Sequence, residues 1–148
     1  MTEKMILSLE TGDVEIELLA DKAPKHVDQI KRLAEDGFYD GLTLHRVISG
    51  FMAQMGCPNG TGTGGSGSNI DAEFNDVSHQ RGIVSMARSQ NPNSADSQFF
   101  ICFDDASFLD GQYTAWGKVV AGMENVDSVE FGEPPANPTK IVKFRVTA

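Results

Sequence analysis

The chain has 148 residues, of which 40% are hydrophobic and 22% are charged, and its formal net charge is −9. These values fit one globular domain over residues 1–148, and the absence of an apolar run near the ~20 residues that a membrane helix needs argues against a transmembrane protein. Because nucleic acids and anionic lipid surfaces attract basic faces, the negative charge argues against both as partners.

The first residues, MTEKMILSLETGD, lack the apolar segment and the cleavage site of a signal peptide, so we expect a cytoplasmic protein. Apolar residues alternate with polar or smaller ones from Met5 to Leu9 and again from Val14 to Leu18, on either side of Thr11-Gly12. This alternation around a turn signal predicts a β-hairpin with one buried face.

The apolar period becomes helical from Pro24 to about Asp36. Proline is accepted in the first turn of a helix, and Gly37 suits the position after the last turn. This segment therefore predicts an amphipathic helix that packs by one face onto a sheet. A second, short helix is predicted from Met123 to Val129, after Gly122.

The remaining segments predict short strands separated by loops. Residues 58–69, PNGTGTGGSGSN, cannot build a packed core and predict a long surface loop. With the hairpin, the chain has about eight strand candidates, and the pattern alone leaves both a barrel and a sandwich open. The further strand candidates are residues 43–48, 51–56, 82–87, 98–103, 114–120 and 140–146.

Two segments combine strong hydrogen-bonding side chains with apolar ones: HRVISGFMAQ at residues 45–54 and SQFF at residues 97–100. Such a mixture predicts an apolar pocket with a fixed cation on its wall. The polar side chains are Arg46, Gln54 and Gln98, and the apolar ones are Phe51, Met52 and Phe100.

Together with GIVSMAR at residues 82–88 and the stretch from FLDG to WGKVVAGM at residues 108–123, these segments resemble the cyclophilins, which are peptidyl-prolyl cis/trans isomerases. The resemblance covers nearly the whole chain. It implies a mainly β fold, a closed eight-stranded antiparallel β-barrel capped by two α-helices, one at each open end. It further implies a monomeric isomerase of X–Pro bonds in peptides and in folded or unfolded client proteins, with no cofactor and no metal.

Prolyl isomerisation requires no nucleophile, metal or proton transfer, because its barrier is the amide resonance that is lost when the C–N bond twists. The twisted nitrogen regains a lone pair, so a donor aimed at it favours the transition state over the planar substrate. Arg46, which is planar and always charged, is the candidate donor. The alternative is an ordinary surface arginine, and the motif around Arg46 favours the catalytic role.

The resemblance assigns the other site residues around Arg46. Gln54 would brace Arg46 and contact a substrate carbonyl, and Gln98 would contact the substrate beside the pocket. The backbone at Ala87-Arg88 would pair with the extended peptide as an added strand does. Phe51, which we group with the catalytic residues, would form the proline pocket with Met52, Phe100 and Leu109, while Tyr113 would close the pocket and Phe108 would contact the substrate.

The chain differs from the best-known eukaryotic cyclophilins at several positions. Phe108, Tyr113 and Arg88 stand where those proteins carry tryptophan, histidine and asparagine, and Met55 and Leu44 replace a glycine and a phenylalanine. Such changes resemble the bacterial branch of the family. Because the eukaryotic tryptophan helps to bind cyclosporin, we expect this drug to be only a weak ligand of the chain.

The three histidines are not expected to act chemically. Strand alternation directs His45 to the face opposite Arg46, which favours a structural role over that of a general base. His26 and His79 have no acidic or cysteine neighbour at metal-ligand spacing and are expected on the surface.

The two cysteines form no CxxC pair and are expected to be reduced thiols. Cys102 lies in the apolar run FFICF and is expected in the core. Cys57 opens the Gly-rich loop and is expected to be more exposed, which leaves a redox role open.

Two other function classes remain open. The same pocket could hold proline-containing segments without relevant catalysis, although the presence of Arg46 favours an enzyme. Alternatively, GTGTGGSG at residues 60–67 could bind a nucleotide in an unrelated small barrel. This run lacks the Lys-Ser/Thr of a P-loop and no clear helix follows it.

Overall fold

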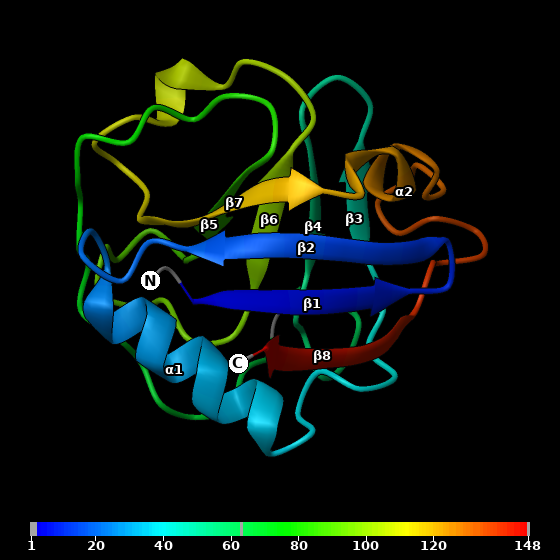
Figure 1. The fold of residues 1–148 in the computed structure, drawn as a ribbon, viewed down its shortest axis with the longest axis horizontal. Helices are drawn as coiled ribbons and strands as arrows, with labels where there is room; N and C mark the ends of the chain where they lie inside the picture. Colours follow the sequence, from blue (N-terminus) through cyan, green and yellow to red (C-terminus); the bar gives the residue numbers. More distant parts are fainter. Residues whose placement is uncertain (1–2, 63, 148) are drawn as a thin grey trace.

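The computed structural model describes residues 3–62 and 64–147 of the chain, and within them eight β-strands form one sheet in the order β3-β4-β6-β5-β7-β2-β1-β8. Every neighbouring pair of strands is antiparallel. The sheet curves, so that β1, β2 and β8 cross in front of β3, β4 and β6 in Figure 1. The strands are β1 (Lys4–Leu9), β2 (Gly12–Leu18), β3 (Arg46–Ile48), β4 (Met52–Met55), β5 (Ile83–Met86), β6 (Phe99–Cys102), β7 (Ala115–Ala121) and β8 (Ile141–Thr147).

The edge strands of this sheet, β3 and β8, form no ladder with each other in the part of the chain that the structure describes. An isolated bridge joins Thr43 to Lys140, and Leu44 N donates to Thr139 O at 2.9 Å. β3 (three residues) pairs with β4 on one edge, and on its other edge Val47 is bridged to Gly132 instead of to β8. The predicted barrel is therefore correct in strand number and direction, whereas full closure is wrong: the sheet is an antiparallel half-barrel.

Both predicted helices are present. α1 (Pro24–Glu35) starts at the predicted proline, and Gly37 follows its end with φ +76°. α2 (Met123–Asp127) ends earlier than the predicted Val129. Figure 1 shows the two helices at opposite ends of the curved sheet. The sequence pattern does not predict the short 3₁₀-helix η1 (Ser107–Leu109), which lies near the site described below.

Buried apolar side chains form two separate clusters, because successive residues of a strand point to opposite faces. In β6, Phe99 and Ile101 belong to the main core, whereas Phe100 and Cys102 belong to a smaller group. The largest side chains of the main core are Trp116, Tyr39, Phe99 and Phe144. The smaller group, called the outer cluster, consists of Met52, Phe100, Cys102 and Ala106, with Ile48, Phe51, Ala87, Leu109 and Tyr113 partly buried against it.

The surface placement predicted for two histidines is wrong. His26 and His79 are 0% and 1% exposed. His26 Nδ1 lies 2.7 Å from Glu73 Oε1, and His79 Nδ1 lies 2.9 Å from Asp110 Oδ1. Each acid is more than thirty positions away in sequence, so the local spacing gives no sign of these pairs.

Both cysteines are free and buried, which confirms the prediction for Cys102 and contradicts the exposure expected for Cys57. The Cys57 sulfur accepts the backbone N–H groups of Gly62 (3.3 Å) and Gly64 (3.2 Å). Burial raises the pKa of this thiol, but the backbone donors of the loop outweigh burial and bring the pKa down to about 7. Burial raises the pKa of Cys102 to about 12.

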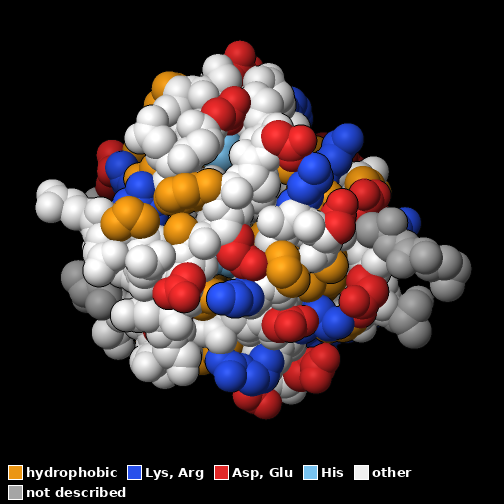
Figure 2. All heavy atoms as spheres, turned by 90° about the vertical axis from the view of Figure 1, so that its left-hand side faces the viewer, with side chains coloured by type: hydrophobic (Ala, Val, Ile, Leu, Met, Phe, Trp, Pro, Cys, Tyr) orange, Lys and Arg blue, Asp and Glu red, His pale blue; other side chains and the backbone are white. Residues whose placement is uncertain are grey.

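Neither a membrane-spanning helix in the described residues nor one dominant charged patch on the face in Figure 2 is found. No helix in the described ranges is long and apolar enough to cross a bilayer. On the face shown in Figure 2, acidic and basic side chains are interspersed, and apolar side chains form small separate groups. The negative net charge is therefore not concentrated on this face.

Candidate active site

An apolar cleft of about 120 Å³ opens where the outer cluster reaches the surface. Its walls come from β3, β4, β6 and the segments that follow β5 and η1. Two cations, Arg46 and Arg88, line it together with mainly apolar side chains. The cleft brings together nine residues predicted from sequence: Arg46, Phe51, Met52, Gln54, Ala87, Arg88, Phe100, Leu109 and Tyr113.

Strand pairing places the polar residues of this cleft side by side. Arg46 of β3 lies opposite Gln54 of β4, and Gln54 lies opposite Phe100 of β6. Directly opposed residues on neighbouring strands share a face and have Cβ atoms ~4.5–5.5 Å apart. The turn between β3 and β4, where Gly50 adopts φ +74°, thus brings the two ends of the HRVISGFMAQ segment together.

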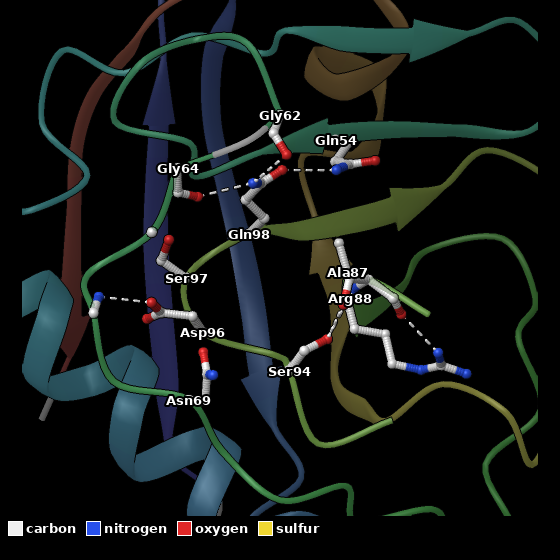
Figure 3. Close-up of a pocket in the computed structure, with 13 residues that line it drawn as sticks. Gln54, Gly62, Gly64, Asn69, Ala87, Arg88, Ser94, Asp96, Ser97 and Gln98 are labelled. Atoms are coloured by element: carbon white, nitrogen blue, oxygen red, sulfur yellow. Dashed lines mark hydrogen bonds between the residues drawn. The ribbon is translucent and has the colours of Figure 1, made fainter. Parts of the chain in front are cut away.

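A series of side-chain amides fixes the orientation of Gln54. Gln98 Nε2 donates to the carbonyl oxygens of Gly62 (3.0 Å) and Gly64 (2.9 Å), and its Oε1 accepts from Gln54 Nε2 at 2.9 Å. Gln54 Oε1 is thereby turned toward Arg46 and accepts from Nη1 at 3.4 Å. Figure 3 shows Gln98 between the Gly-rich loop and Gln54. The amides therefore present an acceptor, not a donor, to the guanidinium.

The guanidinium of Arg46 is held from a second side by Glu133. Arg46 Nε donates to Glu133 Oε1 at 3.0 Å, and the two side chains are 45% and 57% exposed. Sequence reasoning missed Glu133, because it lies 87 positions from Arg46 in the loop before β8. Within the described ranges, Arg46 Nη2 has no hydrogen-bond partner, so it is available to a ligand in the cleft.

A polar network, in which His79 and Ser85 are buried and Asp110 is partly exposed, lies behind the cleft and supports Phe100. The His79 ring stacks on Phe100 with centroids 6.3 Å apart, and its Nε2 lies 2.8 Å from Ser85 Oγ. Asp110 accepts the backbone N–H of His79, and this bond lowers the pKa of the Asp110 carboxyl. Ser85 is fully buried, so no substrate reaches this Ser–His–Asp arrangement, which is structural. Sequence reasoning missed it.

A second pocket, of about 410 Å³ and lined mainly by polar residues and glycines, adjoins the cleft and shares Gln54, Ala87 and Arg88 with it. In Figure 3 the Arg88 side chain points away from this pocket. Its Nη2 donates to Gln112 O at 2.7 Å, and the guanidinium lies 4.6 Å from the centroid of the Tyr113 ring. The cleft and this pocket therefore share one wall. The other residues that line the polar pocket are Gly62, Gly64, Gly65, Gly67, Asn69, Ser89, Ser94, Asp96, Ser97 and Gln98.

Two predicted substrate contacts have a distinct geometry. The Ala87 N–H already donates to Gln98 O at 2.9 Å. A bound peptide would therefore pair with the carbonyl of Ala87 and not with the N–H of Ala87. Phe108 does not line the cleft: it is 66% exposed and lies beside Phe51 at the rim, with ring centroids 5.7 Å apart. The roles of these residues toward a substrate stay predictions.

In the described part of the Gly-rich loop, the N–H groups of Gly62 and Gly64 are not free to bind a phosphate. The N–H groups of Gly62 and Gly64 are bonded to the Cys57 sulfur, and their carbonyls accept from Gln98. Both sides of this backbone are thus used internally, which weighs against the nucleotide-binding alternative. Among the residues with described positions, no group of three or more His, Cys, Asp or Glu could hold a metal ion.

His45 lies under the same loop and is buried. Burial lowers the pKa of its ring, and the neighbouring charge of Arg46 lowers it further. A neutral, buried ring fits the structural role predicted for His45.

Comparison with known proteins identifies relatives along the whole chain. Residues 4–146 match the family of cyclophilin type peptidyl-prolyl cis-trans isomerase/CLD proteins. A probable peptidyl-prolyl cis-trans isomerase of Brucella suis biovar 1 is 51% identical over 161 residues, which cover 97% of this chain and 82% of the relative.

Solved structures agree with this match. The crystal structure of a cyclophilin type peptidyl-prolyl cis-trans isomerase from Cryptosporidium parvum has a TM-score of 0.93 at 29% identity, covering 100% of this chain and 99% of that one. A second structure from that organism, in the presence of the dipeptide Ala-Pro, has a TM-score of 0.91 at 30% identity, covering 98% and 99%.

Proposed function

This chain belongs to the cyclophilin-type peptidyl-prolyl cis-trans isomerases and is an enzyme of that kind, and we propose that it holds the proline of an X–Pro segment in the apolar cleft while Arg46 stabilises the twisted bond. The observation that carries this proposal is the placement of one braced guanidinium at the edge of the cleft. Its substrates would be proline-containing peptides and client proteins. The Cryptosporidium parvum relative studied with Ala-Pro supports this substrate class.

The energy that the site must supply is moderate. Twisting the amide costs ~18–20 kcal/mol, and X–Pro bonds relax uncatalysed in ~10–100 s. An ordinary enzyme turnover requires an acceleration of roughly 10⁴-fold, or about 5.5 kcal/mol. One preorganised donor is worth ~2.7–4 kcal/mol in other enzymes, and an apolar pocket that fixes the proline would supply the rest.

Arg46 is suited to act on the twisted state alone. In the planar substrate the prolyl nitrogen shares its lone pair with the carbonyl and accepts no hydrogen bond, whereas the twisted nitrogen does. A guanidinium held through Nε by Glu133 and through Nη1 by Gln54 loses little further freedom when Nη2 bonds that nitrogen. The interaction therefore lowers the barrier without tightening substrate binding equally.

Gln54 and the apolar residues would fix the substrate around this donor. The second oxygen lone pair and second N–H of Gln54 leave it able to contact a carbonyl of the bound peptide. Phe51, Met52 and Phe100 would surround the proline ring and exclude water, which strengthens the electrostatic action of Arg46. No step of this mechanism requires a cofactor or a metal.

A peptide-exchange measurement tests this function. We expect a strong acceleration of cis/trans exchange in an Ala-Pro peptide, followed by NMR, in the presence of a metal chelator. An unchanged exchange rate with folded protein would contradict the proposed mechanism. Binding of the peptide without acceleration would favour the alternative of a proline-binding module.

A further inference from the structure

We propose that Glu133 sets the charge preference of the enzyme, favouring cationic and disfavouring acidic side chains beside the X–Pro bond. This inference rests on the proposed function and extends it to the choice of substrate. It is carried by the ion pair between Glu133 and Arg46, and by the hollow that both residues line.

The fold places Glu133 beside Arg46 by backbone pairing. Val47, next to Arg46, forms an isolated bridge with Gly132: Val47 N donates to Gly132 O at 2.8 Å, and Gly132 N donates to Val47 O at 2.9 Å. Gly132 adopts φ +147°, and a Cβ at this position would lie 2.6 Å from Pro135 Cα. A glycine is thus required for the loop to fold so tightly, and the loop then delivers the carboxylate to the guanidinium.

A third hollow, of about 550 Å³, lies across Arg46 and Gln54 from the proline cleft, because both residues line the two hollows. Among the described residues that line this hollow, Arg46 and Glu133 are the charged ones. His45 also lines it, but burial lowers the pKa of the His45 ring and so favours its neutral form. A peptide whose proline occupies the cleft can extend a neighbouring residue into this hollow. The other lining residues are Gly60, Thr61, Gly62 and Pro134.

Glu133 would act on a charged substrate in two ways. An exposed arginine beside a peptide groove would otherwise pair with an acidic side chain of the substrate, which would pull the guanidinium from the prolyl nitrogen. Glu133 occupies the Nε edge of Arg46 and repels such a side chain. Its second carboxylate oxygen, Oε2, has no hydrogen-bond partner within the described ranges and can accept a bond from a lysine or arginine of the substrate.

Stability does not account for this pair. Both side chains are about half exposed, and an ion pair in that setting contributes little to folding. The pair instead stands at the point where substrate passes from one hollow to the next.

The test compares peptides that differ only in one residue flanking the X–Pro bond, Lys, Gln or Glu, placed in turn before and after the proline. We expect the wild type to prefer Lys over Glu in kcat/KM by roughly three- to fivefold at low salt at one of these positions, as exposed charge pairs do. The preference should shrink in 0.5 M NaCl, because salt screens exposed charges.

Two variants and one control decide the outcome. Glu133→Gln, which keeps an acceptor for Arg46, should bring the Lys-to-Glu ratio near unity, and Glu133→Lys should invert it. Glu35→Gln removes one exposed charge from α1, far along the chain, and should leave the ratio as in the wild type. Melting of each variant checks that it is folded.

The inference is wrong if the ratio in Glu133→Gln equals that of the wild type while the Gln peptide is still turned over. That result would leave the proposed function intact. If the wild type itself does not catalyse isomerisation of the Gln peptide, the proposed function is wrong, and this inference is wrong with it.

Discussion

The main core and the outer cluster are built from the same strands, but they differ in how completely the rest of the chain covers them. Phe99 and Phe100 are neighbours in β6, both nearly inaccessible to solvent at 0% and 5% exposure. Phe99 packs in the main core against Trp116 and Tyr39, with ring centroids 5.4 and 5.6 Å away. Phe100 packs on the other face of the sheet, where the apolar cover is incomplete.

The incomplete cover makes the second region a candidate site. The main core is enclosed by the half-barrel and its helices, so its apolar surface is satisfied within the chain. Among the described residues, the short η1 and its flanking segments lie over the outer cluster, and the candidate cleft opens beside them. One face of the sheet thus carries the enclosed main core, and the other face carries the candidate site.

The largest expected effect is on stability. Phe99→Ala should lower the free energy of unfolding by ~3–5 kcal/mol, because it empties a fully enclosed part of the main core. The kcat/KM of the fraction that remains folded should change little. Denaturant unfolding and activity, measured at a temperature where the variant is folded, check both statements. A large loss of kcat/KM in fully folded protein would show that the two regions are not separate.

Phe100→Ala and Met52→Ala should affect substrate binding more than Phe99→Ala does. Each removes a wall of the cleft, so the KM for a proline peptide should rise by roughly tenfold or more, from a loss of ~1.5–3 kcal/mol of apolar contact. Both side chains are also buried in the outer cluster, so a stability cost of about 2–5 kcal/mol is expected. Peptide titrations and melting curves on the same samples separate the two terms. Full activity in both variants would place the proline elsewhere.

A smaller effect is expected at the rim. Phe108 keeps an apolar face but lacks the indole N–H of the tryptophan found in eukaryotic relatives, so a cyclosporin group that accepts this hydrogen bond would be left unpaired, at ~1–3 kcal/mol. We therefore expect the drug to bind roughly ten- to a hundredfold more weakly than it binds those relatives. Phe108→Trp should restore part of the affinity and change peptide turnover much less. Drug binding by the unchanged chain as tight as in those relatives would refute this account of position 108.

The sequence predicts the elements because their signals are local. Alternation from Met5 to Leu9, and the change to helical period at Pro24, each lie within one segment and are found as predicted. The apolar run of β6 is different, since both faces of this strand are buried and periodicity cannot tell them apart. Only pairing with β4 and β5 shows which of its residues face the cleft.

The sequence predicts the motif residues of the candidate site, but not the residues from distant segments that hold them in place. Arg46 and Gln54 fall in one ten-residue segment, so their proximity follows from a single tight turn. Glu133, by contrast, reaches Arg46 only through a bridge between distant segments. The same holds for Asp110 beneath His79. Interactions between distant segments depend on how the chain closes on itself, which the local pattern does not specify.

The most direct test of the central claim is the kcat/KM of Arg46→Ala on a short Ala-Pro peptide. We expect a loss of at least ~10²-fold, about 2.7 kcal/mol, with nearly unchanged melting because the side chain is 45% exposed. The matched control is Arg145→Ala, which removes an exposed arginine from β8 and should retain wild-type activity. Near-normal kcat/KM in Arg46→Ala would contradict the account and show that the apolar cleft alone is sufficient for catalysis.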